Sequence, residues 1–233
     1  MVVLSPDDIV FYNWGTISIN ETIVSTWLVM IVLISLAWMT TRHLSIEPPI
    51  SFWQNLFETL IGYMDSQIRG IAQMNPDRYI PFSGTLFLFI SVANLLDIVP
   101  GYQTPTSSLS TTAALAICVF FAVPIYGIER VGVIGYLKHY AEPSILMLPF
   151  HIIGEISRTI ALAVRLFGNM MSETMLIAIL LSIAPLFLPV PMELLGVLIG
   201  QVQAYIFAVL ATVYIVSASS VEGRIVNEPK GEI

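Results

Sequence analysis

Charged side chains are scarce in this sequence. Only 11% of the 233 residues are Asp, Glu, Lys or Arg, whereas 56% are hydrophobic. A soluble domain carries about 25% charged residues. The deficit therefore argues against a soluble protein and indicates a chain surrounded mainly by lipid. The length accommodates about five membrane helices of about 20 residues each.

Cysteine and histidine are also rare, with one Cys and three His residues. Because Cys118 is the only cysteine, a disulfide within one chain and a cysteine-based metal site are excluded. Cys118 lies within an apolar stretch. The three histidines lie far apart in the sequence, which argues against a metal site. We expect no metal, no cofactor and no nucleic-acid partner.

The apolar runs predict an all-α integral membrane protein with about five membrane helices and a surface amphipathic helix. We expect a single membrane domain, 1–233, with these parts: an outer N-terminal segment (1–21), a first span (22–41), a surface amphipathic segment (45–79), a second and a third span (80–128), and a long hairpin (144–220). The first arm of the hairpin would be about 60 Å long as one helix. The hydrocarbon core is only about 30 Å thick, so this arm must be strongly tilted, broken or partly outside lipid.

Basic residues outside the hairpin predict the orientation of the chain. Five passages place all seven on one side of the membrane: Arg42, Arg69, Arg78, Arg130, Lys138, Arg224 and Lys230. By the positive-inside rule that side is cytoplasmic, with the N-terminus outside and the C-terminus inside.

The first arm of the hairpin carries a line of polar residues. At about 100° per residue, they fall within an arc of about 80° and extend over about 33 Å of helix: His151, Glu155, Arg158, Arg165, Asn169 and Glu173. A charged side chain at mid-membrane costs about 2.5–3.5 kcal/mol on insertion scales. We therefore expect this line to face protein or water rather than lipid.

The second arm has a complementary face. Glu193, Gly196, Gly200 and Gln203 lie on one side of it, and the glycines would let another helix approach closely. The turn between the arms brings Gln203 near the depth of Arg165.

Several of these residues also have a simpler explanation. Arg158 could extend to the interface or pair with Glu155, and His151 could be a packed or water-contacting residue. Gln203 could only join two helices, and Asp97 could cap a helix end. Arg165 is the hardest to explain in this way, because no acid in its own arm lies one turn away. Its counter-charge is expected from another helix or another subunit.

Four blocks of sequence resemble subunit a of the rotary F-type ATP synthases. They are Arg165-Leu-Phe-Gly-Asn169-Met with Gln203-Ala-Tyr-Ile-Phe, Asn94-Leu-Leu-Asp97-Ile-Val-Pro100, Pro105-Thr106 with Thr111-Thr112-Ala-Ala-Leu-Ala, and Glu155-Ile-Ser-Arg158. The resemblance extends from about Leu44 to Ser220. It implies two tilted arms that curve around a rotating ring of c subunits, within a complex that also contains peripheral-stalk b subunits.

The resemblance also implies a mechanism. Arg165 matches the essential arginine that faces the ion-binding carboxylate of each c subunit, while two aqueous half-channels carry H+ or Na+ to and from the ring. The subunit itself is not catalytic, because ATP chemistry occurs elsewhere in the complex. A bacterial plasma (inner) membrane is the expected location of this multi-pass protein.

This sequence departs from the family pattern at two channel positions. Many relatives carry Glu nine residues after the arginine and a polar residue seven before the glutamine, where this chain has Thr174 and Gly196. Glu173 and Glu193 lie nearby, and we expect both to line the outer half-channel. His151, Glu155, Arg158 and Asp97 are further candidates for half-channel lining.

Three other substitutions resemble the N-type branch of the family, which is often sodium-linked: Thr159, Ser108 and Ser110. The alternatives to an ATP synthase subunit are a stand-alone secondary transporter or ion channel, and a structural membrane scaffold. A stand-alone transporter would be expected to contain internal repeats, and we find none in the sequence.

Overall fold

A computed structural model describes residues 10–14, 17–42, 52–71, 76–99, 102–141, 145–183 and 189–219. Its helices are α1 (Glu21–Thr41), α2 (Phe52–Ile71), α3 (Ile80–Leu96), α4 (Leu109–Ala141), α5 (Leu148–Ile183) and α6 (Pro189–Ser219). Short 3-10 turns occur at η2 (Pro76–Arg78), η3 (Pro105–Ser107) and η4 (Ile145–Met147). Two strands, β1 (Val10–Trp14) and β2 (Ile17–Asn20), form an antiparallel hairpin before α1.

Four of these helices are long and apolar enough to cross a membrane. They are α1, α5, the part of α4 from Leu109 to Arg130, and the part of α6 from Val190 to Ala218. The chain is therefore a multi-pass membrane protein built mainly of helices. The expected count of five spans is not confirmed, because α3 has only 17 residues and would be about 26 Å long. The all-α expectation also missed the short β1–β2 hairpin.

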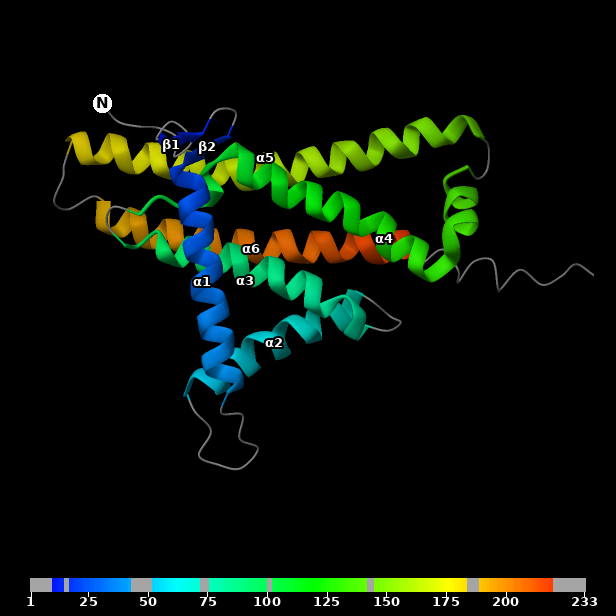
Figure 1. The fold of residues 1–233 in the computed structure, drawn as a ribbon, viewed down its shortest axis with the longest axis horizontal. Helices are drawn as coiled ribbons and strands as arrows, with labels where there is room; N and C mark the ends of the chain where they lie inside the picture. Colours follow the sequence, from blue (N-terminus) through cyan, green and yellow to red (C-terminus); the bar gives the residue numbers. More distant parts are fainter. Residues whose placement is uncertain are drawn as a thin grey trace, which may run out of the picture.

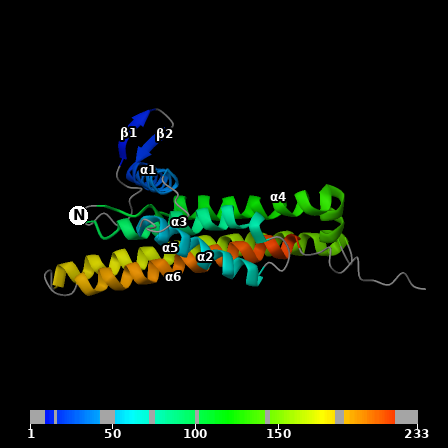
Figure 2. The same ribbon diagram turned by 90° about the horizontal axis from the view of Figure 1, so that it is seen from below.

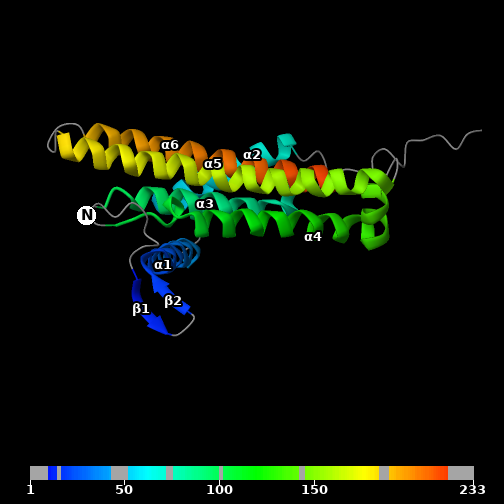
Figure 3. The same cartoon turned by 90° about the horizontal axis from the view of Figure 1, so that it is seen from above.

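The long helices lie in two layers, and α1 crosses them. In Figure 1, α3, α4, α5 and α6 all run along the long axis of the molecule, whereas α1 runs almost at right angles to it. Figure 2 and Figure 3 show α1 end-on, with the α3–α4 layer between it and the α5–α6 layer. One face of the α5–α6 layer is therefore left uncovered by the rest of the described chain.

The core lies between the two layers and is lined by small residues of α6. Ala204, Ala208 and Ala211 are buried on one side of α6 together with Phe207. They pack against buried residues of α3, α4 and α5 such as Ile90, Val119, Leu162, Leu166 and Met170. Small side chains allow helices in a membrane to approach closely, and contact between the layers requires this here.

Helix α4 bends sharply near its C-terminal end. Gly132 has φ 79° and ψ 163°, a backbone conformation that is essentially restricted to glycine. The ring of Tyr136 then folds back onto Gly127, where an added Cβ would lie 2.6 Å from the ring. The bend places the end of α4 beside the start of α5.

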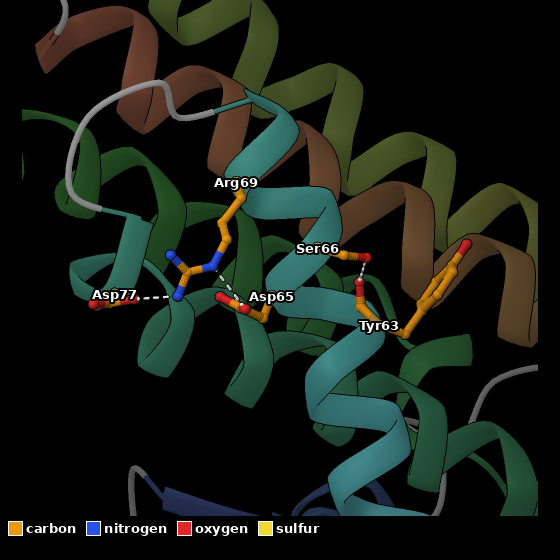
Figure 4. Close-up of polar contacts among 5 residues, drawn as sticks. All are labelled: Tyr63, Asp65, Ser66, Arg69 and Asp77. Carbon is orange, nitrogen blue, oxygen red and sulfur yellow. Dashed lines mark hydrogen bonds and ion pairs between the residues drawn. The ribbon is translucent and has the colours of Figure 1, made fainter.

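Ion pairs connect the end of α2 to the turn that precedes α3. Arg69 Nε donates to Asp65 Oδ2 at 2.7 Å, and its Nη2 donates to Asp77 Oδ1 of η2 at 2.8 Å (Figure 4). Arg78, also in η2, pairs with Glu129 of α4. These pairs are exposed, and such pairs contribute at most about 1 kcal/mol each, so they orient the connection more than they stabilise it.

Candidate functional site

Arg165 lies in the middle of α5 with its side chain exposed. No residue in the described part of the chain forms a hydrogen bond or an ion pair with it. The expectation that its own arm supplies no counter-charge holds among these residues, and none of the described neighbouring helices supplies one either. The guanidinium is therefore available to a group from outside the chain.

One turn along α5, Asn169 connects this position to α6. Its Nδ2 donates to Oε1 of Gln203 at 2.8 Å. Gln203 is only 3% exposed, and its Nε2 has no hydrogen-bond partner in the described structure. The predicted proximity of Gln203 to the polar line of α5 is thus observed, and the contact is made through Asn169 rather than through Arg165.

The polar line of α5 does not face a single environment. Arg158, Arg165 and Asn169 are exposed, whereas Glu155 and Glu173 are partly buried against the rest of the chain. An arc of about 80° is wide enough for its two edges to meet different neighbours. The line therefore includes both exposed residues and residues that border cavities in the described structure.

A cavity of about 300 Å³ brings together three acids that the sequence places far apart. Asp97 from the end of α3, Glu173 from α5 and Glu193 from α6 all line it. Burial raises the pKa of Asp97 to about 6; a hydrogen bond with the Thr104 backbone opposes this rise, and the charge of Glu193 adds to it. We call this space the outer cavity.

Hydroxyl groups in the loop between α3 and α4 complete the outer cavity, and the sequence analysis missed them. Tyr102, Thr104 and Ser107 line it beside the acids. Burial raises the pKa of the Tyr102 phenol, and the Asp97 charge raises it further. The cluster of uncharged hydroxyl residues in this loop could have indicated that the loop lines a polar cavity. The same composition is also typical of an ordinary turn.

Glu173 borders a second cavity as well. This space has a volume of about 190 Å³ and is also lined by Asn169, Ser172 and Gly196. Glu173 thus lies between the outer cavity and a space that reaches Asn169, one turn from Arg165.

The glycines of α6 admit side chains rather than a helix backbone. The position of a Cβ on Gly196 is filled by the Glu173 carboxylate, and at Gly200 the Asn94 amide group lies within 3.0 Å. Asn94 Nδ2 donates to the Gly200 carbonyl at 2.9 Å, and its Oδ1 accepts from Thr106 at 3.0 Å. At Gly200 the helix that approaches α6 closely is thus α3, whereas at Gly196 a side chain of α5 fills the space.

The remaining candidates gather at the opposite end of the α5–α6 pair. His151, Glu155 and Arg158 line a cavity of about 250 Å³ together with Ser217 of α6. Arg158 Nη1 pairs with Glu155 Oε1 at 3.1 Å, as one of the simpler explanations expected, and its guanidinium lies 5.2 Å from the ring centroid of Tyr214. This inner cavity starts about 10 Å along α5 from Arg165.

No cluster of three or more His, Cys, Asp or Glu residues suited to a metal ion occurs among the described residues. The acids of the outer cavity thus border a common space without forming a metal-binding set.

Comparisons with known proteins identify the family of the chain. Residues 23–216 match the family model described as ATP synthase A chain. The chain is 57% identical over 219 residues to ATP synthase subunit a 2 of Acaryochloris marina, covering 94% of both chains. It is 55% identical over 221 residues to ATP synthase subunit a 1 of Crocosphaera subtropica, covering 95% of this chain and 96% of the relative. ATP synthase subunit a of Albidiferax ferrireducens is 53% identical over 229 residues, which is 98% of this chain and 97% of the relative. With matches of this extent, the chain belongs to the ATP synthase A chain family.

Proposed function

We propose that this chain is the stator subunit of an ATP synthase membrane sector, conducting H+ or Na+ through two half-channels to and from the carboxylates of a rotating c-ring. Ion flow would thereby be coupled to ATP synthesis or hydrolysis elsewhere in the complex. The chain would also contact peripheral-stalk b subunits. Its N-terminus would lie outside a bacterial inner membrane, and its C-terminus would be cytoplasmic.

The exposed guanidinium of Arg165 carries this proposal. Its neighbour in α5, Val164, is apolar and 55% exposed. A cation placed there against lipid costs about 2.5–3.5 kcal/mol on insertion scales, so a protein partner with a negative charge is the stable alternative. A carboxylate that arrives on another subunit supplies that charge.

Arginine suits this position for a chemical reason. A guanidinium beside a buried carboxyl group favours its charged form and so promotes release of the ion. The guanidinium cannot itself be deprotonated, so it does not pass a proton directly from one half-channel to the other.

The two ends of the α5–α6 pair would supply the half-channels. The outer cavity contains Asp97, Glu173 and Glu193, and the space beyond Glu173 reaches Asn169. The inner cavity contains His151, Glu155 and Arg158. Since these cavities are offset along α5, an ion would pass from one to the other while bound to a carboxylate of the rotating ring.

Substitution of Arg165 in the complete ATP synthase tests the proposal. We expect Arg165→Ala to abolish ATP-driven ion pumping into vesicles, and Arg165→Lys to fail as well, because a lysine covered by the ring can lose its proton whereas arginine cannot. Arg69→Ala, which changes an exposed ion pair, is the control and should pump normally. Normal pumping by Arg165→Ala would overturn the proposal.

The outer path is tested separately. We expect Glu173→Gln and Glu193→Gln each to slow pumping, because each removes an ionisable group from the outer cavity. Full rates in both variants would refute the assignment of these acids to the half-channel. Ion flux by the purified chain without ring subunits would instead favour a stand-alone transporter.

A further inference from the structure

The carboxyl group of Glu173 occupies the space that a side chain at Gly196 would fill. A Cβ placed on Gly196 would overlap this group, since its three nearest heavy atoms are the Glu173 Oε1, Cδ and Oε2 atoms. Gly196 is buried, and Glu173 is partly buried. The Glu173 carboxyl group therefore fills the space beside Gly196, which we call the notch.

Hydrogen bonding does not account for the position of this carboxylate. In the described part of the chain, no residue donates a hydrogen bond to Glu173 and none forms an ion pair with it. By contrast, the amide of Asn94 in the neighbouring notch at Gly200 is held by two hydrogen bonds. The space left by the missing side chain of Gly196 is thus the feature that accommodates the Glu173 carboxylate.

The notch lies at a boundary. Gly196 and Glu173 line the cavity that reaches Asn169, and Glu173 also lines the outer cavity. A methyl group at residue 196 would push the carboxylate toward one of the two spaces. A carboxylate displaced in this way no longer borders both cavities.

We propose that Gly196 is a positioning residue for Glu173, whose carboxylate needs the missing side chain at residue 196 in order to border both cavities. The importance of Gly196 would then depend on the size of the side chain at residue 173. This inference rests on the proposed function, in which Glu173 lies on the ion path.

A set of three variants of the complete ATP synthase tests the fit: Gly196→Ala, Glu173→Asp, and the two combined. We expect Gly196→Ala to lower ATP-driven pumping about fivefold or more, because the added methyl group displaces a residue with which it is in direct contact. Aspartate is one methylene shorter and retreats from the added methyl group. The double variant should therefore pump faster than Gly196→Ala alone.

Gly84→Ala is the matched control, because Gly84 lies in α3 and an added Cβ there meets nothing within 4 Å. It should leave pumping unchanged. Thermal stability of the purified membrane sector is the second measurement, since it reports the fit of residues 173 and 196 whether or not ions pass. We expect Gly196→Ala to lower the Tm and Glu173→Asp to restore part of it.

The outcomes separate the two proposals. Gly196→Ala could lower pumping and Tm by the same amount in the native protein and in the Glu173→Asp variant. That result would overturn the positioning role, because the loss would then come from general helix packing. No loss of Tm or pumping in Gly196→Ala would overturn it too. Recovery of the Tm in the double variant, with pumping unaffected in every variant, would support the fit and contradict the proposed ion path.

Discussion

At the scale of single residues, the site depends on groups whose environment differs sharply over short distances. Arg165 is exposed, whereas Gln203, linked to Asn169 one turn away, is almost fully buried. A buried amide whose NH2 group has no acceptor is costly, by about 1–3 kcal/mol, unless water or another group accepts from it.

Asp97 gives a pH prediction at this scale. Burial raises its pKa from 3.8 to about 6, so between these values the folded chain binds more protons than the unfolded chain. The free energy of unfolding should therefore fall as pH rises through this window. Asp97→Asn should remove this contribution and make the fall smaller, which Tm measurements on the purified membrane sector at about pH 4 and about pH 7 would detect.

Glu193→Gln is the companion variant for Asp97. Loss of the Glu193 charge removes one cause of the raised pKa, so the fall in stability should be smaller but still present, since burial is the larger cause. An unchanged pH dependence in Asp97→Asn would contradict the prediction.

At the scale of elements, buried polar pairs fix the position of α6 against α3. Ser83 and Thr212 share a hydrogen bond of 2.7 Å and both have 0% exposure. Gln201 Nε2 donates to the Ser91 carbonyl at 3.0 Å, and Asn94 holds the Gly200 carbonyl. These contacts set the register of α6 and so the depth of Gln203.

The Ser83–Thr212 pair gives a stability prediction. Thr212→Val should lower the free energy of unfolding by about 1–3 kcal/mol, because it leaves the buried Ser83 hydroxyl without its partner. Adding Ser83→Ala should recover most of this loss, since no unpaired group then remains. Denaturant unfolding of the purified membrane sector would measure both. Additive losses in the double variant would contradict the prediction.

At the scale of the whole molecule, the order of the layers decides which surface faces a partner. Figure 2 and Figure 3 place α1 and the α5–α6 pair on opposite sides of α3 and α4. The α5–α6 pair, which includes Arg165, is thus remote from α1. A ring that meets Arg165 would contact the exposed apolar side of α6 and leave α1 to lipid or to other subunits.

Cross-linking tests this arrangement. Cys118 is the single cysteine, so Cys118→Ser provides a suitable background. A cysteine introduced by Leu198→Cys on α6 should form disulfides with cysteines introduced on the outer surface of c subunits. Ile31→Cys on α1, which is similarly exposed at 64%, should form none. Cross-links from Ile31→Cys would contradict the proposed ring-facing surface.

The sequence by itself determined that the chain belongs in a membrane, where its long apolar helices lie, and that Arg165 has no counter-charge within its own arm. These features follow from composition and from the spacing of residues along one helix, which local periodicity reports directly. The blocks around Arg165 and Gln203 also carried enough sequence information to indicate the family.

Only the tertiary structure decided which neighbours the polar residues meet. It placed Glu173 in the notch at Gly196, Asn94 at Gly200, and Asp97 in one cavity with two acids from other helices. It also divided the polar line of α5 between an open face and the interior. Spacing along a helix gives the direction in which each side chain points from the helix axis. The residue that it meets in that direction comes from a distant part of the chain and depends on how the helices pack.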